Sequence, residues 1–185
     1  TLKFEQVYNQ ETNDETLKGL ITVMKSLTKL HTIDLDLQPS AKEVITEEGL
    51  ITFYQDLKQF SGLESVKIGV YREKKVTDEA LKSLKTTLEG FSALKSLTLS
   101  FQSCEALTDE AVNHISQALQ RLTSLEVLDI NFGRIPTITD QALKYLAENI
   151  TALKNVEKAS ICFDRCKITD EGLKSISEAV QKLPA

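Results

Sequence analysis

The protein is 185 residues long; 41% of its residues are hydrophobic and 26% are charged, which is the balance of a soluble globular protein. Its net charge of −5 argues against extended nucleic-acid binding, because that function needs a basic surface. No apolar run approaches the roughly 18 residues of a membrane-spanning helix, so none is predicted.

Short segments of alternating apolar and polar residues recur along the chain, as in half-buried β-strands. The segment from Leu97 to Phe101, for example, reads Leu-Thr-Leu-Ser-Phe. Successive segments start 31, 33, 31, 31 and 31 residues apart, and so regular a period indicates a repeat fold. The expected strands are residues 2–6, 33–37, 66–70, 97–101, 128–132 and 159–163.

A helix with a clear start signal is predicted after each strand. A residue able to cap a helix N-terminus comes first, followed by one or two carboxylates that favour the positive end of the helix dipole. Stacking would align these carboxylates into an acidic ridge. Helix-start chemistry explains such a ridge, and a docking surface for a basic partner is the alternative. The capping residues are Asn13, Thr46, Thr77, Thr108, Thr139 and Thr169.

The predicted architecture follows from this alternation. Each strand returns to the same sheet after a helical crossover, so the strands are expected to be parallel and the crossovers right-handed. The fold class is therefore α/β: a right-handed solenoid, or horseshoe, of about six repeats of roughly 31 residues, with a curved parallel sheet on the concave side and helices on the convex side. We expect residues 1–185 to form one such domain of a longer chain, with residues outside this segment or an oligomeric contact covering at least one end of the stack.

The strands share the pattern L-x-x-L-x-L, which resembles the leucine-rich-repeat family. Residues 30–35, 63–68, 94–99 and 125–130 match it, and residues 156–161 are a degenerate copy. The helix openings "ITDQAL" and "ITDEGL" are similar to those of the ribonuclease-inhibitor-like and cysteine-containing subclasses. Where the family usually has Asn or Cys, an apolar row that includes Phe101, Phe132 and Phe163 is expected to fill the bend instead.

Motifs for chemistry are few. The two histidines, His31 and His114, lie far apart in the predicted stack, and no P-loop, G-x-S-x-G or H-E-x-x-H motif occurs. Cys162 and Cys166 lack the spacing and partners of a zinc site. We therefore predict no catalytic residue, metal or cofactor, although Cys162 on the open face is a candidate reactive thiol.

The open face of the sheet and the loops after the strands are the candidate binding surfaces. Alternate strand residues project from the concave face and differ between repeats, unlike the helices. For this face, the alternatives are recognition of a partner and an ordinary solvated sheet surface. The loops after the strands carry basic residues, and for these loops the alternatives are binding and an ordinary soluble surface. The longer loop 38–45 is a further candidate. The candidate residues are Asp34, Asp36, Lys67, Gly69, Tyr71, Arg72, Thr98, Ser100, Gln102, Asp129, Asn131, Arg134, Ser160, Cys162, Asp164 and Arg165.

These features predict a non-catalytic module that binds a protein partner on a rigid concave face and its adjacent loops. The alternatives are a structural spacer in a large assembly, and a regulator of a small GTPase, which the subclass resemblance implies because similar repeats occur in Ran GTPase-activating proteins. No nucleic-acid or membrane partner is expected. Three cysteines without a disulfide framework favour a reducing, cytoplasmic location.

Overall fold

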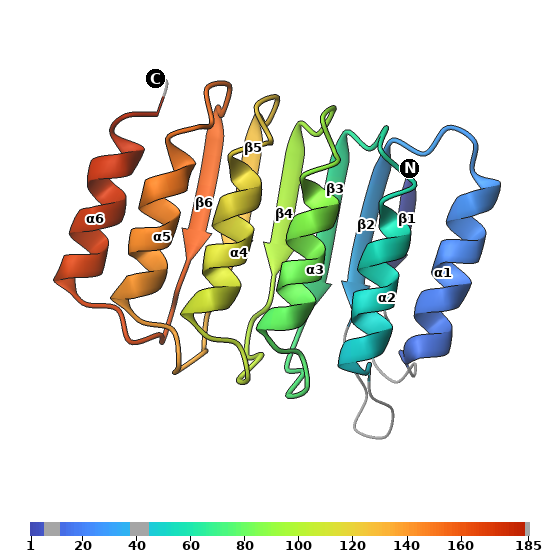
Figure 1. The fold of residues 1–185 in the computed structure, drawn as a ribbon, viewed down its shortest axis with the longest axis horizontal. Coiled ribbons are helices and arrows are strands. Elements are labelled where there is room, and N and C mark those ends of the chain that lie inside the picture. Colours follow the sequence, from blue (N-terminus) through green and yellow to red (C-terminus); the bar gives the residue numbers. More distant parts are fainter. Residues whose placement is uncertain (6–11, 38–44, 184–185) are drawn as a thin grey trace.

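The computed structural model describes residues 1–5, 12–37 and 45–183, and along them strands and helices alternate strictly (Figure 1). The strands are β1 (Leu2–Glu5), β2 (Thr32–Leu37), β3 (Ser65–Val70), β4 (Ser96–Ser100), β5 (Val127–Asn131) and β6 (Lys158–Cys162). The helices are α1 (Asp14–Ser26), α2 (Glu47–Leu57), α3 (Asp78–Leu88), α4 (Asp109–Leu119), α5 (Asp140–Ile150) and α6 (Asp170–Val180).

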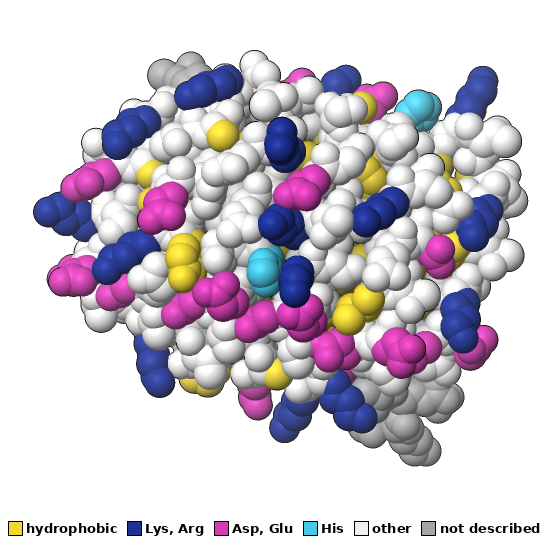
Figure 2. Space-filling view, viewed as in Figure 1, with side chains coloured by type: hydrophobic (Ala, Val, Ile, Leu, Met, Phe, Trp, Pro, Cys, Tyr) yellow, Lys and Arg dark blue, Asp and Glu magenta, His cyan; other side chains and the backbone are white. Residues whose placement is uncertain are grey.

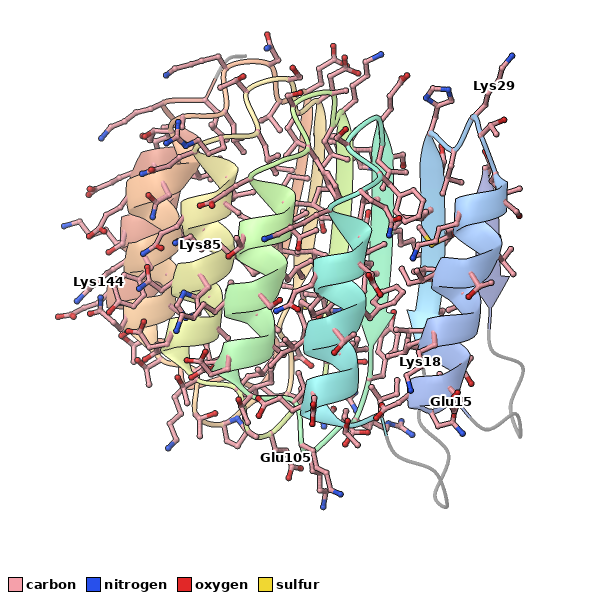
Figure 3. All side chains as sticks on the ribbon, turned by 45° about the vertical axis from the view of Figure 1, so that its right-hand side comes forward. Glu15, Lys18, Lys29, Lys85, Glu105 and Lys144 are labelled. Carbon is pink, nitrogen blue, oxygen red and sulfur yellow. The ribbon has the colours of Figure 1, made fainter. Side chains whose placement is uncertain are left out.

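The strands form one parallel sheet in chain order, from β1 to β6, with the helices in a layer along one of its faces (Figure 1 and Figure 3). Neighbouring strands lie about 4.8 Å apart, whereas packed helices need about 8–10 Å. The stack therefore bends toward the strands, which leaves the sheet on the concave side of a leucine-rich-repeat solenoid. None of the helices in the described part of the chain has the length and apolar character needed to cross a membrane.

The core lies between the two layers. In the repeat formed by β4 and α4, Leu97 and Leu99 of the strand and Val112 and Ile115 of the helix belong to the same buried core. All four are at most 1% exposed. Because each repeat buries its apolar residues against the repeats on either side, the core is continuous along the stack.

Hydrogen bonds at the helix starts join the repeats in series. The Asp109 carboxylate accepts from the backbone N–H and the hydroxyl of Thr139, both at 2.7 Å, and Thr139 in turn caps α5. The same pair of bonds runs from Thr46 to Asp14, from Thr108 to Asp78 and from Thr169 to Asp140, and the Thr77 hydroxyl donates to Glu47. We call this series the Thr–Asp ladder. It shows that the acid after each cap is bonded to the next repeat as well as facing its own helix dipole.

A row of aromatic rings fills the bend after the later strands, as the sequence predicts. The ring centroid of Phe132 lies 5.5 Å from that of Phe101 and 6.0 Å from that of Phe163. Phe101 and Phe132 are fully buried. Leu37 and Val70 face each other in register at the equivalent positions of β2 and β3.

The predicted strand boundaries are wrong by one residue at several ends. Strands β2 to β6 begin one residue earlier than expected, and β4 to β6 end before the phenylalanine. The early start of β3 to β6 arises because the backbone N–H of Ser65, Ser96, Val127 and Lys158 already donates to a carbonyl of the preceding repeat.

Candidate recognition surface

The sheet register places the sequence-predicted strand residues in two rows across the open face, which we call the concave face. One row runs Asp34, Lys67, Thr98, Asp129, Ser160, and the other runs Asp36, Gly69, Ser100, Asn131, Cys162. These residues come from five separate repeats, yet the register holds neighbouring members directly opposite one another.

Two of these residues are not available on the surface as expected. Gly69 and Ser100 face each other at the centre of the sheet, and both are buried. The Ser100 hydroxyl oxygen has no hydrogen-bond partner among the described residues. Gly69 lies under the Tyr71 ring: a Cβ placed on Gly69 would approach the ring atoms to 2.5–2.7 Å.

Tyr71 is therefore seated on the sheet, and the absence of a side chain at position 69 makes room for it. Tyr71 itself remains half-exposed. An aromatic ring held in one orientation over a flat sheet has the form of a binding anchor, because little side-chain entropy remains to be lost when a partner contacts it.

An ion pair lies beside this ring. The Lys67 Nζ is 3.0 Å from Asp34 Oδ1, across the β2–β3 pair. The hydrogen bond to Asp34 raises the pKa of Lys67 above its ordinary value. Lys67 is thus a fixed cation between the acidic pair of β2 and the Tyr71 ring.

Backbone strain marks the loops that follow the strands. Arg72, Ser103, Arg134 and Arg165 occupy the same loop position in successive repeats, and each has a φ between 57° and 63°. Such left-handed backbone is unusual for residues other than Gly, Asn and Asp. Three of these residues bond to the loop of the next repeat, at 2.6–3.0 Å. The Arg72 N–H donates to the Gln102 carbonyl, the Ser103 N–H to the Gly133 carbonyl and the Arg134 N–H to the Asp164 carbonyl.

The side chains of these loops lie along one edge of the sheet. Arg72, Arg134, Asp164 and Arg165 are exposed, whereas Gln102 is half-buried. Asp164 Oδ2 lies 3.7 Å from Arg165 Nε and 3.9 Å from Arg134 Nε, so these charges partly offset one another. The predicted loop 38–45 lies outside the described residues except at Ile45, which is buried.

The acidic ridge is present over the helix starts, on the convex side shown in Figure 2. Four of its first-turn aspartates, Asp14, Asp78, Asp109 and Asp140, are engaged in the Thr–Asp ladder. This bonding supports the structural explanation of the ridge.

The cysteines are free, and two of them bond to the backbone of the preceding repeat. Cys104 Sγ lies 3.4 Å from the Val70 carbonyl oxygen, and Cys166 Sγ lies 3.2 Å from that of Phe132. Cys162 is half-buried on the concave face. No group of three or more His, Cys, Asp or Glu side chains within the described ranges is placed to hold a metal ion.

Sequence analysis missed a third row on the same face, at the first residue of each strand. The register aligns Thr32, Ser65, Ser96, Val127 and Lys158. The signal was the residue two places before each member of the first row, which is polar in four of the five repeats and Val127 in the other, but the misplaced strand starts hid it.

Fold and surface together define an α/β solenoid of the leucine-rich-repeat type with a largely polar, non-repeating concave face. The structure is similar to the tropomodulin C-terminal domain of Caenorhabditis elegans, with a TM-score of 0.63, 14% identity and coverage of 90% of this chain and 92% of that one. It is also similar to the leiomodin-1 actin-binding site 2, with a TM-score of 0.61, 14% identity and coverage of 91% and 87%. No family model and no curated protein matches the sequence. At 14% identity the similarity shows the fold alone. It does not support the predicted resemblance to the ribonuclease-inhibitor-like subclass.

Proposed function

We propose that this protein is a non-catalytic recognition module that binds a protein partner on the concave face and the adjacent loop edge. The observation that carries the proposal is the contrast between the two sides of each strand. The inward residues are apolar in every repeat, whereas the outward residues change from Asp to Lys to Thr to Asp to Ser along one row. A rigid scaffold that varies only its exposed row is suited to recognition at low ordering cost.

The centre of the proposed contact is Tyr71 with the Asp34–Lys67 pair. Binding energy is concentrated in a few anchors, among which Tyr is enriched. The ring is already oriented by Gly69, and the neighbouring charges supply register and electrostatic complementarity.

A comparison of partner capture tests the face as a whole. The variant Asp34→Lys, Lys67→Glu, Asp129→Lys and Asn131→Lys is immobilised beside the wild type, and proteins retained from the native cell are identified by mass spectrometry. The matched control carries Glu79→Lys, Lys82→Glu, Glu110→Lys and Asn113→Lys on the helix layer, which changes the net charge by the same amount. A partner kept by the control and lost by the concave variant is the expected result. Retention by both variants would refute the site.

Two single substitutions then test the anchor. Tyr71→Ala removes the ring, and Gly69→Ala displaces it, because the new Cβ occupies the space of the ring. We expect each to weaken binding of the captured partner about 10-fold or more, with the circular dichroism spectrum unchanged. Tight binding by Gly69→Ala would show that the fixed orientation of Tyr71 has no role.

Actin is the first defined partner to test, because the similar leiomodin-1 domain is described as an actin-binding site. Co-sedimentation with filamentous actin and a gel-shift assay with monomeric actin, each with the concave variant and its matched control, give a direct answer. No binding in either assay would remove actin and leave the recognition surface to the capture experiment.

The spacer and GTPase-regulator alternatives remain separable by experiment. A regulator would accelerate GTP hydrolysis by at least one member of a small-GTPase panel, and no acceleration would dismiss that function. A spacer would lose its partners when the ends of the solenoid are altered, and would keep them in the concave variant.

A further inference from the structure

The last repeat presents an open apolar surface, which we call the C-terminal end face: Ile161, Phe163, Ile168, Leu173, Ile176 and Val180. Leu173 is 56% exposed and Val180 is 42% exposed. The residues at the same positions of the preceding repeat, Ile130, Phe132, Ile138, Leu143, Leu146 and Ile150, are at most 2% exposed. The end face thus has the composition of an interior repeat interface, and it encloses a hollow of about 520 Å³.

The backbone of β6 (the left end of the sheet in Figure 1) is also open on this side. The Cys162 carbonyl accepts from the Phe132 N–H, and the Lys158 N–H donates to the Glu126 carbonyl, so these residues turn their backbone groups toward β5. Alternation along the strand turns the groups of Ala159, Ile161 and Phe163 toward the open edge. An added strand therefore finds apolar side chains together with the open-edge backbone groups of Ala159 and Ile161 and the N–H of Phe163, whose carbonyl accepts from the Cys166 N–H.

The sequence of β6 is complementary to itself in the antiparallel sense. When Ile161 lies on a two-fold axis, Ala159 is opposite the partner's Phe163, which sets a small side chain against a large one. The strand pairing ends there, because Asp164 and Arg165 already lie in the turn after β6, where the φ of Arg165 is 57°.

Helix α6 has the same antiparallel complementarity. Its apolar stripe is flanked by Asp170 and Lys174 in the first half, by Glu178 in the second half and by Lys182 in the turn just after the helix. With Ile176 near the axis, Asp170 meets the partner's Lys182, and Lys174 meets the partner's Glu178. The dipoles of the paired helices also oppose each other favourably.

In a head-to-tail arrangement, the C-terminal end face of one copy would pack against the first repeat of the next. This arrangement fits less well, because the start of α1 is already capped within its own repeat. In the later repeats the N–H of the capping threonine donates to the acid of the preceding repeat, as from Thr169 to Asp140. The N–H of Asn13 instead donates to Thr16 Oγ1, within a reciprocal capping box. The Asn13 N–H is therefore already engaged, and it does not offer the hydrogen bond that Asp170 of another copy would accept in a continued ladder.

We propose that the C-terminal end face binds a second copy of this chain through antiparallel pairing of β6 with its two-fold mate, with α6 packed on its mate. The sheet then continues across the axis as a twelve-stranded arc, since each copy supplies six strands. The dimer presents two concave faces side by side. A partner with two epitopes would gain avidity from this pairing, independently of which residues of the concave face contact it.

Charge exchange tests the pairing without disturbing the core. Sedimentation equilibrium of the 185-residue chain is expected to show a monomer–dimer equilibrium. Lys174→Glu and Glu178→Lys should each raise the dimer dissociation constant about 10-fold or more, because each sets like charges opposite one another twice per dimer. The double variant should return to within about threefold of the wild type, because the pair is restored with its signs reversed.

An apolar pair of variants locates the interface. Leu173→Glu should abolish the dimer, and Val23→Glu, on the exposed side of α1 at the other end of the stack, should leave it intact. Both side chains are about half exposed in the single chain, so both variants are expected to keep the wild-type circular dichroism spectrum.

A cysteine substitution tests the register. Ser160→Cys faces the partner's Cys162 when Ile161 is on the axis, so mild oxidation should give a disulfide-linked dimer. Thr98→Cys in β4 should remain monomeric on a non-reducing gel. A wild type that is monomeric up to about 100 μM, well above typical dimer affinities, would overturn the proposal. So would a dimer unaffected by Leu173→Glu, or open-ended oligomers.

Discussion

At the scale of single residues, the first acid of a helix does more than favour its own helix dipole. Asp140 accepts two hydrogen bonds from Thr169 of the next repeat, at 2.7 and 2.6 Å. These bonds hold the pKa of Asp140 below its ordinary value. A carboxylate with a lowered pKa stabilises the fold above its unfolded-state pKa, and this contribution is lost as the pH falls through the folded-state value.

Asp140→Asn is therefore expected to lower the stability at pH 7 and to flatten the loss of stability below about pH 4. Urea unfolding at pH 7, 5, 4 and 3 measures both effects. Asp170→Asn is the control, because Asp170 has the same helix position and no ladder partner among the described residues. An equal change of pH dependence in the control would contradict the assignment.

Cys104 shows the opposite kind of shift. Burial raises the pKa of its thiol to about 12, so very little of it is a thiolate at pH 8. We expect Cys162 to be alkylated by iodoacetamide far faster than Cys104 in the native protein, because Cys162 is half-buried on the open face and only the thiolate reacts. Peptide mapping by mass spectrometry after timed pulses gives the two rates, and equal rates would disprove the prediction.

At the scale of elements, each repeat is a strand of four to six residues and a helix of 11 or 13 residues. Neither is stable alone, and the phenylalanine row shows why the repeats need one another. Phe132 is fully buried between the rings of two other repeats, whereas Phe163 has a ring neighbour on one side and is half-buried.

Phe132→Ala is expected to cost about 3–5 kcal/mol of unfolding free energy, because it removes a large buried side chain and leaves a cavity. Phe163→Ala should cost clearly less in the monomer. Urea unfolding of the two variants at low protein concentration measures the difference, and equal costs would show that the row does not stabilise through stacking on both sides.

At the scale of the whole molecule, the protein is a one-dimensional stack, and its stability is the sum of neighbour contacts. The terminal repeats have one neighbour each and the central repeats have two. Local opening should therefore cost least at the ends.

Hydrogen exchange is expected to show the strongest protection in β3 to β5 and faster exchange in β6 and α6. The Phe132 amide donates to Cys162, whereas the described residues contain no further repeat to which the equivalent amide of Phe163 could donate. If the second copy binds as proposed, the protection of Phe163 should rise with protein concentration while that of Phe132 stays constant. Uniform protection along the stack would contradict the one-dimensional description.

Much of the fold could be predicted from the sequence because its signals are local and repeated. The alternation at Leu97 and Leu99, and the cap and acid at Thr108 and Asp109, recur in nearly every repeat, so each copy supports the assignment of the others. The concave residues followed from strand alternation alone. Their exposure did not, because the burial of Gly69 depends on where the Tyr71 ring lies.

The sequence by itself determined the leucine-rich-repeat solenoid, its parallel strand order and the rows on its open face, because strand and helix periods and cap signals are encoded in neighbouring residues. Only the tertiary structure decided which polar groups are bonded. Asp109 meets Thr139 across 30 residues of chain, and Asp34 meets Lys67 across the β2–β3 pair. It also decided which apolar residues stay open: Leu143 and Leu173 match in sequence, but exposure depends on the neighbour, and only Leu143 has a repeat packed against it on each side.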